Sequence, residues 1–179
     1  MKMMKVQNPV VESINSRRSI RSFTGEQIDE DTLIAIAEAG LTAPSATNAR
    51  PRALILVRRR DLLNRLCDAL PYAKMLSKAA AAFVVCGLPK KNPDVAPRFW
   101  TVDCAASTEN ILLAVNALGL GAVWTAVYPS EELVGAVRGI LALPEDVIPL
   151  NVIPVGVPAA PAEPREPDRL DDYLHKETW

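Results

Sequence analysis

The chain has 179 residues, a formal net charge of −1, 49% hydrophobic residues and 23% charged residues. This composition is typical of a globular protein with a sizeable core, and the length suits one domain spanning residues 1–179. An aromatic content of 5% and a slightly acidic balance leave few stacking platforms and no excess of positive charge. A nucleic-acid partner is therefore not expected.

Cysteine and histidine are scarce, with Cys67, Cys86 and Cys104 far apart in the chain and His175 the single histidine. These residues are too few and too dispersed for a disulfide framework or a zinc site, so no metal is expected. Buried, apolar roles are favoured for the three cysteines, with a reactive thiol as the alternative. Polar residues soon after the first five positions leave no apolar stretch for a secretory signal, and a reducing, cytoplasmic setting is expected.

The charge is unevenly distributed along the chain. Residues 1–100 hold 16 basic and 9 acidic residues, a charge of +7, whereas residues 101–179 hold 4 basic and 12 acidic residues, a charge of −8. The two halves therefore attract each other, either within one chain or between two subunits.

Apolar spacing, caps and turn residues predict the secondary structure in chain order. The expected elements are a helix over 9–16, a helix capped by Asp29 and ending near Gly40, a strand over 53–57, a helix over 62–70, a helical turn over 73–78, a strand over 80–86, a helix over 98–118, a strand over 122–127, a helix capped by Ser130 and ending near Leu141, and a strand over 147–157. Pro149 and Pro154 favour an edge or a bend for the last strand. The tail from Pro158 is rich in proline and is expected to be extended, with its aromatic end docked.

The helix over 98–118 is apolar nearly all round in its second half, which predicts burial on most sides. A membrane span is the alternative, because no charge occurs between Asn110 and Ser130. Polar residues and glycines interrupt this stretch, so a central helix inside a domain or between subunits is favoured and no membrane association is expected. Gly119 and Gly121 follow a helix and precede a strand, the reverse of the order that a dinucleotide-binding fingerprint requires.

The segment Asn15–Phe23 concentrates three arginines and several hydroxyls, while Ile20 and Phe23 can anchor it to a core. Guanidinium groups match phosphate oxygens in bidentate geometry, and serine hydroxyls can complete the shell. If this segment is helical, Arg17 and Arg21 share a face. An anion-binding segment is one interpretation, and a solvated basic turn is the other.

Four motifs in order resemble the nitroreductase family of FMN-dependent oxidoreductases, over nearly the whole chain from about Val10 to Trp179. They are Arg17–Phe23, Ala43–Asn48, Gly119–Trp124 and Asp168–Arg169 near a tail that ends in tryptophan. The resemblance implies an α+β fold, a three-layer sandwich with a central mixed sheet flanked by helices. It also implies an intertwined homodimer with FMN in two interfacial pockets.

The resemblance further implies the roles of individual residues. Arg17, Ser19 and Arg21 would hold the phosphate, the ribityl chain and the edge of the ring, with Arg18 beside them. The loop residues would come from the partner subunit, Trp124, Thr125 and Ala126 would offer backbone groups to the ring, and the tail would return a charge to the phosphate. The implied cofactor contacts are Arg17, Arg18, Ser19, Arg21, Pro44, Ser45, Ala46, Asn48, Trp124, Thr125, Ala126 and Arg169.

The implied reaction passes a hydride from NAD(P)H through flavin N5 to a small acceptor such as a nitroaromatic, a quinone or free flavin. No side chain is expected as a catalytic acid or base, which agrees with a sequence that has no Cys/His pair and no Ser/His/Asp arrangement. Two alternatives stay open: a non-enzymatic module that binds flavin or another anionic ligand, and a flavin enzyme of the same fold with a different reaction, such as dehydrogenation or dehalogenation.

Two departures from the family pattern concern the pocket. Arg50-Pro51-Arg52 stands where relatives often have Gln-Pro-Trp, and a basic residue at the rim would favour an anionic substrate or simply be solvated. Pro167 stands where related tails often carry lysine, so Arg165 is a candidate to replace a phosphate contact.

Overall fold

The structure is a computed structural model that describes residues 8–163, 166 and 168–179. The helices are α1 (Pro9–Ser16), α2 (Glu30–Leu41), α3 (Arg60–Ala69), α4 (Ala96–Ala117) and α5 (Glu131–Leu141), with 3-10 turns η1 (Ala46–Asn48), η2 (Lys74–Ser77), η3 (Pro89–Lys91) and η4 (Leu170–Asp172). The strands are β1 (Arg52–Val57), β2 (Ala81–Gly87), β3 (Gly121–Ala122), β4 (Thr125–Ala126) and β5 (Ile148–Gly156).

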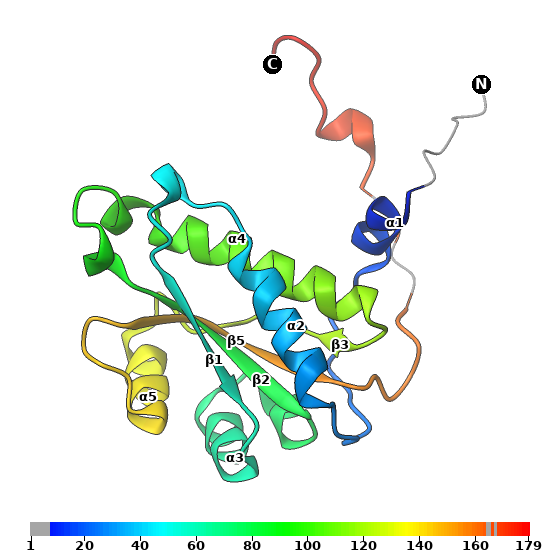
Figure 1. Ribbon diagram of the computed structural model, residues 1–179. Helices are drawn as coiled ribbons and strands as arrows, with labels where there is room; N and C mark the ends of the chain where they lie inside the picture. Colours follow the sequence, from blue (N-terminus) through cyan, green and yellow to red (C-terminus); the bar gives the residue numbers. More distant parts are fainter. Residues whose placement is uncertain (1–7, 164–165, 167) are drawn as a thin grey trace.

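The strands form one sheet in the order β1-β2-β5-β3, with β4 also paired to β5 (Figure 1). Helices α2 and α4 cover one face, and α3 and α5 cover the other. The expected α+β three-layer sandwich is therefore confirmed.

Successive side chains of the two central strands, β2 and β5, point to opposite faces of the sheet and so contribute to two core layers. On β2 and β5, Phe83 and Ile153 pack toward α2 and α4, whereas Val84 and Val152 pack toward α3 and α5. Because both faces of the sheet are covered, these strands are apolar at almost every position. Each large aliphatic side chain buried in this way contributes about 1.5–3 kcal/mol.

The sheet is less mixed than expected, because β1–β2, β2–β5, β3–β5 and β4–β5 are all antiparallel. Among the described residues, parallel pairing is limited to an isolated bridge between Ser19 and Ala122. The chain before α2 meets the edge of the sheet at this single point and then turns to bridge Pro158 through Phe23, so no parallel strand develops there.

Strand β5 lies in the middle of the sheet. Of the two expected alternatives, the edge position is wrong, whereas an irregularity near the prolines is found. The prolines of β5 fall where the ladder is irregular. The register with β2 shifts between Val85 and Cys86, opposite Pro149. Pro154 lies opposite the gap between β3 and β4, since those strands pair with residues 155–156 and 151–152. A central strand tolerates proline here because the neighbouring chain makes no ladder bond at that point.

Two terminal segments stand away from this body on the same side, α1 and the end of the tail (Figure 1). The tail leaves the sheet with a hydrogen bond from Ala159 N to Ser22 O (3.0 Å). From residue 168 onward it is exposed, and Trp179 is 99% exposed. Residues 169–179 are therefore not docked on the core of their own chain, and docking on a partner subunit stays a prediction.

The buried thiols give a direct test of the core. Burial raises the pKa of Cys86 and of Cys104 to about 12. Because the raised pKa keeps both groups protonated at pH 8, we expect neither to react with a disulfide reagent in the native protein, while all three cysteines react after denaturation. Native titration of two or more thiols would contradict this packing.

Candidate functional site

The arginine segment, Arg17–Phe23, is extended rather than helical. Helix α1 ends at Ser16, and Ile20 N donates to Ala122 O (2.9 Å). The two expected anchors are confirmed: Phe23 is 2% exposed, and Ile20 packs against the core. Gly121 and Gly156 make room for them, since a Cβ at either glycine would lie 2.7 Å from Ile20 or Phe23 respectively. Since the segment is not a helix, the shared helical face of Arg17 and Arg21 does not apply.

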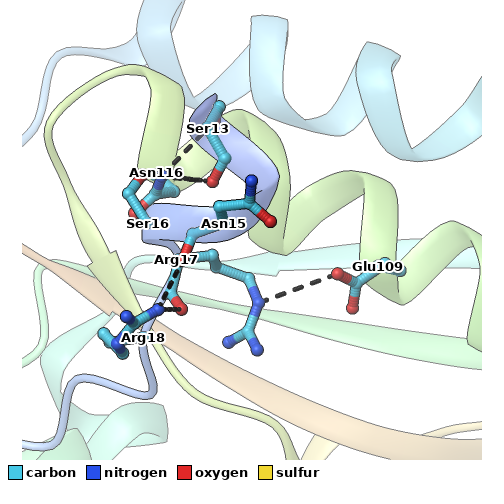
Figure 2. A network of polar contacts seen from close by, with 7 residues as sticks. All are labelled: Ser13, Asn15, Ser16, Arg17, Arg18, Glu109 and Asn116. Atoms are coloured by element: carbon cyan, nitrogen blue, oxygen red, sulfur yellow. Dashed lines mark hydrogen bonds and ion pairs between the residues drawn. The ribbon is translucent and has the colours of Figure 1, made fainter. Parts of the chain in front are cut away.

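The three arginines of this segment differ in their surroundings (Figure 2). Arg17 Nε lies 3.7 Å from Glu109 Oε1 on α4. Arg18 Nη1 donates to Asn15 O (2.8 Å) and Arg17 O (2.7 Å) at the end of α1, and its Nε is buried without a partner. Arg21 is exposed and makes one long hydrogen bond, 3.4 Å from Nη1 to Ser19 O. Arg21 is therefore the arginine most available to a ligand.

Helix α1 is attached to α4 by polar contacts rather than by a core. Asn116 Nδ2 donates to Ser13 O (3.0 Å) and Ser16 Oγ (3.0 Å) (Figure 2). None of the residues of α1 is buried, and its apolar side chains Val10 and Ile14 are exposed. The start of the arginine segment is thus fixed to the C-terminal end of α4.

A cavity of about 370 Å³ lies beside the arginine segment, between it and the first part of the tail. It is lined by Arg18, Ser19, Ile20, Arg21, Ser22 and residues 160–163. Glu163 is the one carboxylate among these residues, so the lining carries a net positive charge. A cationic cavity with serine hydroxyls suits an anionic group such as a phosphate.

Residues Trp124, Thr125 and Ala126 follow shortly after Ala122, which is bridged to Ser19 of the arginine segment. Trp124 and Ala126 are exposed, whereas Thr125 is buried and its Oγ1 donates to Val152 O (2.5 Å). Among the described residues, β4 pairs only with β5, so its outer edge offers unpaired backbone groups. One chain therefore brings the arginine segment and this strand edge together.

The loop Pro44–Arg50 has an unusual backbone. Thr47, Asn48 and Arg50 have φ values of 50°, 57° and 50°, in the left-handed region that costs non-glycine residues free energy. Arg50 N donates to Ser45 Oγ (2.9 Å), and Arg50 Nε donates to Asn48 Oδ1 (2.7 Å). Such a conformation persists only where surrounding contacts hold it.

Two buried charged residues, Arg52 and Asp103, make hydrogen bonds to the backbone of this loop and of the residues just before it. Arg52, 7% exposed, donates from Nη2 to Leu41 O (2.7 Å) and to Ala43 O (2.5 Å). Asp103, 5% exposed, accepts from Ala46 N through Oδ1 (3.0 Å). The rim position considered for Arg52 is wrong, because the carbonyls at the end of α2 draw its side chain inward. Sequence reasoning also missed the role of Asp103, which no local signal on this helix distinguished from Glu109, the other carboxylate of α4.

Within one chain the loop and the arginine segment contact different parts of α4. The helix contacts the loop at Asp103, Arg17 at Glu109 and α1 at Asn116, and the last two positions are about 9 Å and 20 Å from Asp103 along a helix. No hydrogen bond or ion pair joins the two regions in the part of the chain that the structure describes. Pro44, Ser45, Ala46 and Asn48 are therefore not brought to the arginine segment by the fold of one chain.

The tail residue implied as a phosphate contact, Arg169, is exposed, and its Nε lies 3.9 Å from Asp172 Oδ2. No contact with the arginine segment is found for it among the described residues. Arg165 and Pro167 lie outside the described residues.

Within residues 8–163, 166 and 168–179, no group of three or more His, Cys, Asp or Glu side chains is placed to hold a metal ion. None of the helices in that part combines the length and the apolar content that a membrane span needs.

Comparison with known proteins gives concordant results. A sequence model described as the nitroreductase family matches residues 14–73 and 67–157. A protein of Methanothermobacter thermautotrophicus, provisionally named NADH dehydrogenase/NAD(P)H nitroreductase, is 41% identical over 171 residues, covering 95% of this chain and 87% of its own.

Solved structures are similar over the same length. A crystal structure from Parabacteroides distasonis, under the same provisional name, has a TM-score of 0.90 and 37% identity and covers 97% of this chain and 100% of its own. A nitroreductase from Desulfovibrio desulfuricans, also provisionally named and solved in complex with FMN, has a TM-score of 0.80 and 27% identity and covers 97% of this chain and 99% of its own.

The contact between Asp103 and the loop can be tested by substitution. In Asp103→Ala, Ala46 N–H loses its acceptor, so we expect faster hydrogen exchange at that amide and a free energy of unfolding lower by about 1–3 kcal/mol. Asp103→Asn is the matched control, because its amide oxygen can still accept this bond. Unchanged exchange at Ala46 in the alanine variant would show that Asp103 does not hold the loop.

Proposed function

The chain belongs to the nitroreductase family, and on this premise we propose that it is an FMN-dependent oxidoreductase that uses NAD(P)H to reduce a small aromatic acceptor. Nitroaromatics, quinones and free flavin are the acceptors that the family suggests. The observation that carries the proposal is the cationic cavity between the arginine segment and the first part of the tail. The FMN complex of a relative with 27% identity and a closely similar fold supports the choice of cofactor.

The residues present fit the phosphate of FMN. Arg21 is exposed beside Ser19, and the buried Nε of Arg18 lacks a partner among the described residues. Arg17 is about a quarter exposed and could share its charge between Glu109 and a ligand. In this proposal Arg17, Ser19 and Arg21 hold the phosphate and the ribityl chain, with Arg18 beside them.

The edge of β4 suits the ring of the cofactor. Val127 N donates to Leu150 O on β5, so the backbone groups of Trp124 and Ala126, which alternate with it, face away from β5, where no other described strand pairs with them. These groups can bind ring heteroatoms. Thr125 is fixed by its bond to Val152 O (2.5 Å), which holds this edge in register. A rigid strand edge orients a ring better than a free loop.

A second copy of the chain completes the site in this proposal. Two chains related by a two-fold axis, with antiparallel α4 helices, would bring the loop of each to the arginine segment of the other. The exposed apolar side chains of α1 and α4 support this arrangement, as does a cavity of about 390 Å³ between α1, α2 and α4 that includes Val10, Ile14 and Leu113. The opposite charges of the two halves of the sequence favour the same pairing.

A bound FMN would supply the redox chemistry, the transfer of reducing equivalents from NAD(P)H to the second substrate. The protein binds and orients the reactants. Arg21 contributes positive charge that favours added negative charge nearby. The single histidine and the two most buried thiols are not assigned a role as general acid or base in this proposal: His175 stacks with Trp179 in the exposed tail, and burial raises the pKa of Cys86 and of Cys104.

The test is an anaerobic absorbance spectrum of the purified protein with added FMN, before and after NADH and then NADPH. We expect bound flavin with visible absorption that bleaches with at least one nucleotide and recovers with a nitroaromatic or quinone acceptor. If the protein binds no FMN, the proposal is wrong, and the arginine segment would instead be a candidate to bind another anionic ligand. Bound flavin that neither nucleotide reduces would favour a carrier or a different flavin reaction.

A further inference from the structure

We propose that Arg50 makes this site selective for a substrate that carries an anionic group, a carboxylate or a phosphate. The inference rests on the proposed function, because it concerns the substrate bound beside the loop Pro44–Arg50. Two substrates could carry the group: the electron acceptor, through a carboxylate, or NADPH, through its 2′-phosphate.

Arg50 is held in place by four polar contacts. Its backbone N donates to Ser45 Oγ (2.9 Å), and its Nε donates to Asn48 Oδ1 (2.7 Å). Its carbonyl O accepts from Lys91 Nζ (3.0 Å) and from Arg52 N (2.9 Å). These contacts maintain a left-handed backbone at φ 50°, which an arginine adopts only at a cost in free energy. A strained residue that is fixed on both sides has a well-defined position, as a specificity determinant requires.

The terminal amino groups of the Arg50 guanidinium are available to bind a ligand. The residue is exposed, and its two terminal amino groups have no partner among the described residues, since only Nε makes a side-chain bond. Two such groups form the planar fork that binds a carboxylate or a phosphate in bidentate geometry. Arg52, two residues further on, is buried beneath the loop, so the exposed charge on this loop is that of Arg50.

The side chains near Arg50 also carry a net positive charge. Lys91, which contacts its carbonyl, lines a cavity of about 260 Å³ together with Leu88, Lys90 and Asp146. Asp146 is the one carboxylate of that lining, so two ammonium groups outnumber it. The potential near Arg50 therefore favours an anion.

The fork of Arg50 lies next to proposed cofactor contacts. Asn48 and Ser45, which belong to the loop assigned to FMN, are both bonded to Arg50. A substrate that stacks on the cofactor beside this loop would present its substituents to the terminal amino groups of Arg50. A carboxylate or a phosphate at that point gains a charge-assisted pair, whereas a neutral amide gains a weaker hydrogen bond.

The variant Arg50→Gln separates these effects. The amide nitrogen of glutamine stands at the same point of the side chain as arginine Nε, so it can still donate to Asn48 Oδ1, but the fork and the charge are removed. Arg50→Lys restores the charge without the fork. Arg65→Gln on α3, an exposed arginine on the other face of the sheet, is the matched control for a lost surface charge.

The experiment measures kcat/KM of the FMN-loaded protein in two pairs of assays, 4-nitrobenzoate against 4-nitrobenzamide and NADPH against NADH. We expect Arg50→Gln to lower the preference for the anionic member of one pair about tenfold or more, through KM, with the neutral member within about twofold. Arg50→Lys should recover part of this preference, and Arg65→Gln should match the wild type. The preference of the wild type should weaken at high salt.

The outcomes are distinguishable. If Arg50→Gln loses the preference for 4-nitrobenzoate over 4-nitrobenzamide, the anionic group belongs to the acceptor. If it loses the preference for NADPH over NADH, the anionic group is the 2′-phosphate of NADPH. A wild-type protein that reduces acceptors, with both preferences unchanged in Arg50→Gln, overturns the inference and leaves the proposed function intact. A wild-type protein whose flavin neither nucleotide reduces overturns the proposed function, and the inference fails with it.

Discussion

The length and burial of α4 constrain every part of the candidate site. The helix of 22 residues crosses one face of the sheet, and its N-terminal half contacts the loop Pro44–Arg50 while its C-terminal end holds α1 and the arginine segment. Because a helix is rigid, α4 holds the loop and the C-terminal end of α1 at a fixed separation within one chain. In the site proposed above, the loop and the arginine segment would therefore come from two different chains.

Polar contacts on the buried face of α4 fix its position. Ser107 Oγ donates to Gly40 O (2.8 Å), and Thr108 Oγ1 accepts from Asn151 Nδ2 on β5 (2.9 Å). Together with the bond from Ala46 N to Asp103, these contacts tie α4 to α2, to β5 and to the loop. Buried polar groups are costly when unpaired, so this set of bonds disfavours any shift of α4 along its axis. The same bonds that define the core thus define the separation of the two parts of the site.

Local signals in the sequence predicted the elements well, because caps and periodicity act over a few residues. Asp29 and Ser130 cap α2 and α5 as expected, and Ile20 and Phe23 anchor the arginine segment. Features that depend on distant partners were not predictable in the same way. The central place of β5 depends on the break between β3 and β4, and the burial of Arg52 depends on where the carbonyls of α2 end. The role of Asp103 needed the register of α4 against a loop more than fifty residues earlier.

A heterodimer of two variant chains, each with a substitution in a different part of the site, tests most directly whether the site is shared between subunits. Arg21→Glu damages the arginine segment of the site, and Asn48→Glu damages the loop. Every site of either homodimer contains one damaged part, so we expect neither homodimer to bind FMN. A purified heterodimer of the two variants should hold about one FMN per pair of chains, because one of its two sites combines the intact parts. An empty heterodimer, or FMN bound by the Asn48→Glu protein alone, would contradict a site shared between subunits.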